Sequence, residues 1–331
     1  MFATLHGGLP TPPREDPGRD LASAVAAVVR AQAAAGLDPV TDGDLAGGGV
    51  SPSAPGAWQP PGLVEAWLRA AEVGSELEPP RSAKVRLLGP YSLARALAAD
   101  PAAPGNLADE LAEILNARLR ELVEAGCPLV QVDEPDLVRV GADDAERRRF
   151  TAAQHRLLDG VEAHAMLAIV GGNADAAGAS TIFDAPYASL LVDLIAGPDN
   201  WNLVRQAPAD RGIVCGVVPG DADRRVDVPV IVWAAGYAAS ANGRGLDRVG
   251  LSTAGSLAAL SWDEAERRMR LLAAGADLAT ADPETRARRL DPRAMARSRQ
   301  TLGPAVPTPP PDSFGRLPRD VSGRRRDHDD G

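Results

Sequence analysis

The segment from Asn106 to Asp136, NLADELAEILNARLRELVEAGCPLVQVDEPD, decides the fold of this chain. Its first part predicts an amphipathic helix with its leucines on one face. Gly126 ends that helix, and the apolar run from Pro128 to Pro135 predicts a buried strand that a proline stops. A helix that leads directly into a buried strand is the repeating unit of a parallel sheet with helical crossovers.

The same alternation recurs about eight times along the chain. The expected strands cover residues 2–7, 84–90, 128–135, 163–172, 189–195, 212–220 and 247–255. The expected helices cover 20–35, 106–125, 144–161, 230–241 and 262–276, the last opened by a capping box at Ser261 and Glu264. Eight such units within about 280 residues favour a closed barrel over an open sheet. We therefore predict an α/β protein, a single (β/α)8 TIM barrel.

Domain boundaries follow from composition. The barrel is expected to occupy residues 1–282, and residues 283–331 form a tail rich in Pro, Arg and Asp. We expect that tail to be largely extended or disordered, apart from one short helix at 292–300. A Gly/Pro/Ser-rich stretch at 46–62 is long for a plain connection, which suggests a functional or lid loop.

Charge and cysteine usage exclude several classes of protein. The formal net charge of −10 argues against a nucleic acid or an anionic membrane as partner. No stretch approaches 18 apolar residues, so no membrane span is expected, and the N-terminus lacks the pattern of a signal peptide. The two cysteines, Cys127 and Cys215, lie far apart, which favours a reduced, cytoplasmic protein.

Polar residues gather where the expected strands end, and in such barrels the active site lies at the carboxyl ends of the strands. These residues are His6, Asp42, Asp44, Asp133, Glu134, His164, Asp193, Asp221, Ser252 and Thr253. Asp133 and Glu134 carry most information. They either cap the next helix or pair with an arginine, or else grip a substrate amine or act as a general base. The collection predicts a site for a small-molecule substrate.

Metal and nucleotide signals are weaker. His164 lies in the apolar run AHAMLAIV, where a hydrogen-bonded core histidine is the alternative to a ligand. The residue two positions on is Met166, whose thioether is a poor zinc ligand. The glycines at 47–49 and 171–172 do not form G-x-G-x-x-G, so no nicotinamide or flavin cofactor is expected.

Three stretches resemble one known family. They are KVRLLGPYSLARAL (84–97), VEAGCPLVQVDEPDL (123–137) and GLSTAGSLAALSWDEAERRMRLL (250–272). They are similar to the C-terminal catalytic domain of cobalamin-independent methionine synthase, and the likeness runs from about residue 3 to residue 277. The resemblance implies a TIM barrel that transfers a methyl group from a methylated folate to the zinc-bound thiolate of homocysteine.

The resemblance also implies roles for individual residues. Asp133, with its neighbour Glu134, would bind substrate, and Asp44 would grip the amine of the amino acid. The Gly7-Gly8 pair stands at the family's Gly-Ser, and Asp221 stands at its catalytic acid. His164 and Asp193 would be metal ligands.

The implied zinc site is incomplete, because Met166 and Val249 stand where the two cysteine ligands belong. Three hypotheses stay open. The first is a divergent methyltransferase acting on a thiol such as homocysteine. The second is a zinc-independent small-molecule enzyme on the same barrel. The third is a non-catalytic ligand-binding relative.

Overall fold

The computed structural model describes residues 1–45, 62–98 and 106–291. Two compact units emerge, Met1–Asp282 and Pro283–Gly331. The strands of the first unit are β1 (Phe2–Thr4), β2 (Val85–Leu88), β3 (Leu129–Asp133), β4 (His164–Ile169), β5 (Ser189–Asp193), β6 (Gly212–Val218) and β7 (Val249–Thr253). Its helices are α1 (Leu21–Ala34), α2 (Leu63–Ser75), α3 (Pro90–Leu97), α4 (Leu107–Glu124), α5 (Asp144–Leu158), α6 (Ala179–Asp184), α7 (Trp201–Gln206), α8 (Val228–Ser240) and α9 (Trp262–Thr280).

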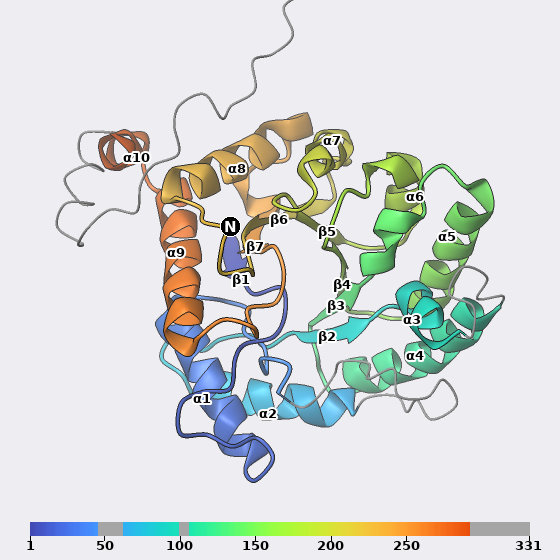
Figure 1. The fold of residues 1–331 in the computed structure, drawn as a ribbon, viewed down its shortest axis with the longest axis horizontal. Coiled ribbons are helices and arrows are strands. Elements are labelled where there is room, and N and C mark those ends of the chain that lie inside the picture. Colours follow the sequence, from blue (N-terminus) through green and yellow to red (C-terminus); the bar gives the residue numbers. More distant parts are fainter. Residues whose placement is uncertain (46–61, 99–105, 292–331) are drawn as a thin grey trace, which may run out of the picture. The chain divides into compact units, whose positions relative to one another are not determined.

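The strands of the first unit form one parallel sheet in the order β1-β7-β6-β5-β4-β3-β2. The two outer strands, β1 and β2, are linked by the segment around Pro39. The Asp38 amide donates to the Ala3 carbonyl, and the Lys84 amide donates to the Val40 carbonyl. This irregular segment takes the place of the eighth strand, so the sheet closes into the predicted (β/α)8 TIM barrel. Figure 1 looks into the ring of strands, with the helices around its outside.

Local sequence signals account for several helix ends. Asp20 caps α1 by accepting a hydrogen bond from the Ser23 amide at 2.9 Å. Ser261 caps α9 in the same way and accepts from the Glu264 amide. The helix expected over 106–125 is α4, and it buries Leu111, Leu115, Leu119 and Leu122 against the barrel. Helices α2, α3, α6 and α7 were not expected. The last three have eight residues or fewer and are too short to show a period, whereas α2 has 13 residues and its apolar spacing was overlooked.

The described part of the second unit forms a helix that the sequence analysis did not expect. Residues Pro283–Leu290 form the helix α10. Its sequence has Pro at the first position, Glu284 in the first turn and two arginines in the last, all of which favour a helix. The helix expected at 292–300 and nearly all of the 46–62 loop lie outside the described residues.

The interior of the barrel has two halves. Residues from β3 to β6 form an apolar cluster, made of Met166, Ala168, Leu191 and Val214 with Leu129 and Val170 beside it. The other half is polar, and is made of side chains from the β1, β2 and β3 region, namely Thr4, His6, Lys84, Arg86, Gln131 and Asp133. The apolar half holds the barrel together by burial, which leaves the polar half available for chemistry. Within the described segments, no helix has the length and apolar character needed to span a bilayer.

Candidate functional site

Four side chains meet at the carboxyl ends of β1, β2 and β3, and we call them the carboxylate cluster: His6, Asp44, Arg86 and Asp133. Arg86 donates through Nε to Asp133 Oδ2 and through Nη1 to Asp44 Oδ2, the latter at 2.5 Å. His6 Nε2 lies 3.2 Å from Asp133 Oδ2, at an angle outside hydrogen-bond geometry. One guanidinium therefore bridges two carboxylates contributed by segments that lie about 90 residues apart in sequence.

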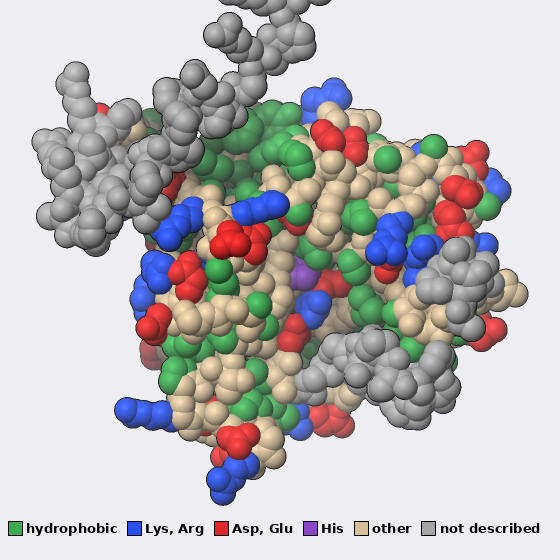
Figure 2. Space-filling model, viewed as in Figure 1, with side chains coloured by type: hydrophobic (Ala, Val, Ile, Leu, Met, Phe, Trp, Pro, Cys, Tyr) green, Lys and Arg blue, Asp and Glu red, His purple; other side chains and the backbone are tan. Residues whose placement is uncertain are grey.

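The cluster has a buried floor and an accessible edge. Asp133 and His6 are buried, whereas about a quarter of each of the Arg86 and Asp44 side chains is exposed. Figure 2 shows acidic, basic and histidine side chains together in the hollow at the centre of the viewed face. A ligand entering from solvent would meet Arg86 and Asp44 first.

Gly7 and Gly8 make room for this arrangement. A Cβ at Gly7 would lie 3.3 Å from Arg86 Nε, and one at Gly8 would lie 3.2 Å from Asp44 Oδ2. Ser256 closes the same edge, because its hydroxyl donates to the Gly8 carbonyl at 3.2 Å. The sequence prediction that Gly7, Gly8, Asp44 and Asp133 share one place is consistent with these distances.

A second layer of polar groups supports the cluster from inside the barrel. Gln131 Nε2 donates to Asp133 Oδ1 and to the His6 carbonyl, both at 2.7 Å. Lys84 Nζ donates to Gln131 Oε1 at 2.7 Å and to the Leu5 carbonyl at 2.6 Å. The orientation of the Asp133 carboxylate is thus fixed through Gln131 by a buried lysine.

Burial and charge act in opposite directions on these groups. Burial alone would raise the pKa of Asp133, but His6 and Arg86 beside it outweigh burial and hold that pKa well below its usual range. For Arg86, burial is likewise outweighed by Asp133 and Asp44, which raise its pKa. Burial lowers the pKa of Lys84 to about 7, although Asp133 opposes it. Asp133 is therefore ionised and Arg86 charged at neutral pH.

Two buried polar groups beside the cluster lack partners among the described residues. They are the Nδ1 atom of His6 and the hydroxyl of Ser252 on β7. Ser252 pairs in register with Thr4, two residues before His6. Buried polar groups are usually hydrogen-bonded, so unpartnered atoms here indicate a place where a ligand or water completes the bonding.

Glu134 does not belong to the site. Successive strand residues point to opposite faces, and its carboxylate accepts from the Tyr91 amide at 3.0 Å and from the Ser92 amide at 2.7 Å. Gln154 Nε2 donates to it as well. Burial raises the pKa of Glu134 to about 7. The expected substrate-binding role is corrected: Glu134 caps α3, as the structural alternative in the sequence analysis stated.

The expected metal ligands His164 and Asp193 are not placed to share an ion. His164 is the first residue of β4 and bonds Ser189 Oγ at 2.8 Å, whereas Asp193 ends β5 at the other end of the barrel. About five residues of strand, roughly 16 Å, separate the two levels. The Asp193 carboxylate is occupied by the amides of Gly171, Ile195 and Ala196.

Other donors do not rescue a zinc site. Burial raises the pKa of Cys127 to about 11 and that of Cys215 to about 12, so neither thiolate forms readily. Over residues 1–45, 62–98 and 106–291, no group of three or more His, Cys, Asp or Glu side chains could hold a metal ion. The donor set in this part of the chain does not fit zinc, and the assignment of His164 and Asp193 as ligands is corrected.

Asp221, the expected catalytic acid, lies in the loop after β6. Its side chain is about half exposed, accepts from the Arg224 amide at 2.8 Å and lies 3.5 Å from Arg224 Nε. These contacts fit a carboxylate that stabilises its own loop. The structure gives no contact between Asp221 and the carboxylate cluster.

The sequence analysis missed Arg86, Lys84 and Gln131. A signal was present in both strands, because KVRLL and LVQVD place polar residues at every second position of otherwise apolar strands. That alternation indicates one polar face. Burial on both faces obscured it, since a strand in a barrel reads as a nearly continuous apolar run.

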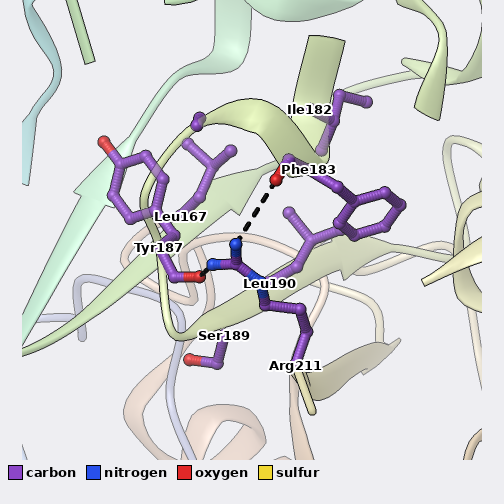
Figure 3. A pocket seen from close by; sticks show the side chains of 8 residues that line it. Leu167, Ile182, Phe183, Tyr187, Ser189, Leu190 and Arg211 are labelled. Atoms are coloured by element: carbon purple, nitrogen blue, oxygen red, sulfur yellow. Dashed lines mark hydrogen bonds between the residues drawn. The ribbon is translucent and has the colours of Figure 1, made fainter. Parts of the chain in front are cut away.

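A small cavity elsewhere in the barrel is too small to be a ligand site. It lies between β4, β5 and α6, measures about 10 Å³ and has mostly apolar walls. Arg211 donates there to the carbonyls of Tyr187 and Phe183 (Figure 3). A space of this size holds at most one water, so its arginine serves to fix the loop before β5.

Residues 63–231 match the family model described as cobalamin-independent synthase, N-terminal domain. The chain belongs to the cobalamin-independent synthase family. The sequence analysis named the right family and the wrong domain, since it pointed to the C-terminal catalytic domain. The zinc-ligand positions had been carried over from the C-terminal catalytic domain, so the match to the N-terminal domain removes their basis.

Two curated relatives are 5-methyltetrahydropteroyltriglutamate–homocysteine methyltransferases. The protein from Salinibacter ruber is 32% identical over 146 residues, which cover 44% of this chain and 18% of the relative. The protein from a Chelativorans species is 34% identical over 149 residues, which cover 44% of this chain and 19% of the relative. The match thus spans about a fifth of the length of each relative.

Solved structures agree on the fold. A B12-independent methionine synthase from a Shewanella species, in complex with selenomethionine, has a TM-score of 0.69 at 17% identity. The alignment covers 84% of this chain and 98% of that one. A putative vitamin-B12-independent methionine synthase from Listeria monocytogenes has a TM-score of 0.63 at 14% identity and covers 85% and 98%. At these identities the likeness shows the fold alone.

Proposed function

We propose that this chain is a divergent methyltransferase of the methionine-synthase type that acts on a small amino-acid thiol such as homocysteine, without zinc held by the protein. The carboxylate cluster is the observation that carries the proposal. Family membership supports methyl transfer as the reaction class, and the methylated folate in the relatives' name is the donor we propose. We place the reaction in the cytoplasm, in keeping with two free cysteines.

The charge pattern of the cluster suits a zwitterion. Arg86 and Asp44 form an ion pair at 2.5 Å whose two members are both partly exposed. An α-amino acid carries a carboxylate and an ammonium group on one carbon, so it can exchange partners with such a pair. Its carboxylate would bind Arg86 and its ammonium group would bind Asp44.

The chain's own residues can also handle a proton. His6 lies beside Asp133, and its Nδ1 atom has no partner in the described part of the chain. In the proposed reaction His6 takes the proton of the acceptor's S–H bond, and the sulfur forms a bond to the methyl carbon as the bond between that carbon and the donor nitrogen of the folate breaks. The protonated His6 then gives the proton to that nitrogen. Asp133 stabilises the protonated imidazole.

Binding and turnover are tested separately. Isothermal titration calorimetry of the full chain with L-homocysteine should give saturable binding that Asp44→Asn weakens by about 10- to 100-fold, as expected for one lost charged contact. Asp199→Asn is the matched control, because Asp199 is an exposed carboxylate in the loop after β5 that bonds Asn173. Methyl transfer is then followed from a labelled methylated folate to homocysteine.

The outcomes separate the open hypotheses. Binding with methyl transfer that His6→Gln abolishes supports the proposal. Binding without transfer favours the non-catalytic relative, for which the absence of a fitting metal site among the described residues is the specific argument. No binding of homocysteine or methionine to the wild-type chain refutes both.

A further inference from the structure

A polar cavity of about 150 Å³ lies apart from the carboxylate cluster. The loop that follows β6 lines it with Pro219, Arg224 and Arg225, and one side of α9 lines it with Arg267 and Arg268. The lining contains four arginines against two carboxylates, in a chain whose formal net charge is −10. Figure 2 shows basic and acidic side chains gathered between α8 and α9.

Arg268 forms part of the cavity wall, and its guanidinium is already hydrogen-bonded within the protein. It is 5% exposed, and it donates to Glu264 Oε1 at 2.9 Å, to the Arg224 carbonyl at 3.1 Å and to the Pro219 carbonyl. Glu264 is held by Arg267 and Arg268 together. Burial would raise the pKa of Glu264, but these two arginines outweigh it and lower that pKa. The loop is thus anchored to α9 by a buried arginine.

Two arginines of the lining, Arg225 and Arg267, have N–H donors that remain available to a ligand. Arg267 is 64% exposed and uses one Nη atom on Glu264. Arg225 makes no hydrogen bond or ion pair with any residue in the described part of the chain. Both line the same space, and a guanidinium matches carboxylate and phosphate oxygens with parallel N–H groups. The amino end of α8, at Asp227, lies in the same lining and adds its positive dipole end.

We propose that this cavity binds a small oxyanion group, a phosphate or a carboxylate carried by a ligand, with Arg225 and Arg267 as its grips. A volume of about 150 Å³ is about five times the space of one liquid water, roughly 30 Å³. It accommodates an oxyanion together with part of the molecule that carries it. The site is independent of the proposed methyl transfer, since no residue of the carboxylate cluster lines it.

The test measures anion binding to the full chain by calorimetry, at constant ionic strength set with chloride. Inorganic phosphate and citrate serve as the two probes and distinguish a phosphate group from a carboxylate group. Arg225→Gln combined with Arg267→Gln should weaken the better probe by about tenfold or more, because charge-assisted contacts are lost. Arg270→Gln is the matched control, since Arg270 is also 64% exposed on α9 and paired with a glutamate but does not line the cavity.

Saturable binding of either probe, weakened by the double variant and unchanged in Arg270→Gln, supports the proposal. Failure of both probes to bind above the chloride background overturns it. An equal loss in Arg270→Gln also overturns it, because the effect would then be one of net charge. Circular dichroism of the double variant should match the wild type, as both side chains are exposed and Arg268 still anchors the loop.

Discussion

Replacing Arg86 with methionine tests whether this guanidinium holds the carboxylate cluster together. The change leaves the buried Asp133 carboxylate beside His6 and Gln131 without its hydrogen-bonded guanidinium partner. A hydrogen bond to a charged group contributes about 1.5 to 3 kcal/mol. The contact with Asp44 is partly exposed on both sides and adds at most about 1 kcal/mol. We therefore expect Arg86→Met to lower the free energy of unfolding by about 2 to 4 kcal/mol at pH 7.

Urea denaturation followed by circular dichroism measures this loss. Arg118→Met is the control, because Arg118 pairs with Glu121 on the exposed surface of α4 and its loss should cost under about 0.5 kcal/mol. In the Asp133→Asn background, Arg86→Met should cost at least about 1.5 kcal/mol less, since the carboxylate it neutralises is gone. Equal midpoints for Arg86→Met and Arg118→Met, or strict additivity in the double variant, would refute the reasoning.

The stability contributed by the Asp133 carboxylate should decrease as the pH is lowered. The folded-state pKa of Asp133 lies below its unfolded value, so its contribution is complete above the unfolded pKa of about 3.9. This contribution is lost as the pH falls through the folded-state pKa of Asp133. The gap between the wild type and Arg86→Met should therefore narrow when the denaturation is repeated below about pH 4.

Three further predictions concern other parts of the barrel. Burial lowers the pKa of Lys84 to about 7, so the unfolded chain binds more protons between pH 7 and 10; stability of the wild type should rise from pH 7 to 9, relative to Lys84→Met, by up to about 2 to 3 kcal/mol in urea melts. A Cβ at Gly89 would lie 2.3 Å from the Glu134 carboxylate, so Gly89→Ala should cost about 1 to 3 kcal/mol in thermal unfolding, whereas Gly236→Ala, with nothing within 4 Å, should not destabilise. Elemental analysis of the purified chain should find far less than one zinc per chain, and the same amount in His164→Ala; stoichiometric zinc that is lost in that variant would contradict the geometry.

Much of the fold could be predicted from the sequence, because it is written in local patterns. The leucine period of α4, the glycine at its end and the apolar strand after it define a helix–strand unit without any tertiary information. Repetition of that unit implies a parallel barrel, and a parallel barrel places strand ends together. This reasoning predicted that Asp44 and Asp133 lie together at the strand ends, and the family resemblance added Gly7 and Gly8.

The positions within strands were harder, because they depend on register. Asp133 and Glu134 are adjacent in sequence, yet one faces the interior and the other caps α3. The two-residue period says only that they face opposite ways. His164 was placed at the wrong end of the barrel, although its position at the start of its apolar run was a usable signal.

By itself the sequence determined the barrel and the level at which the acidic residues lie, because helix and strand periods, glycine stops and strand-end carboxylates are all local features. The family was indicated separately, by the resemblance of three stretches. Only the tertiary structure decided that Arg86 neutralises Asp44 and Asp133, that His164 and Asp193 cannot share a metal ion, and that four arginines surround one cavity. These facts depend on which strands are neighbours and on the direction of each side chain. Contacts between residues tens of positions apart in sequence fix both, and no local pattern encodes them.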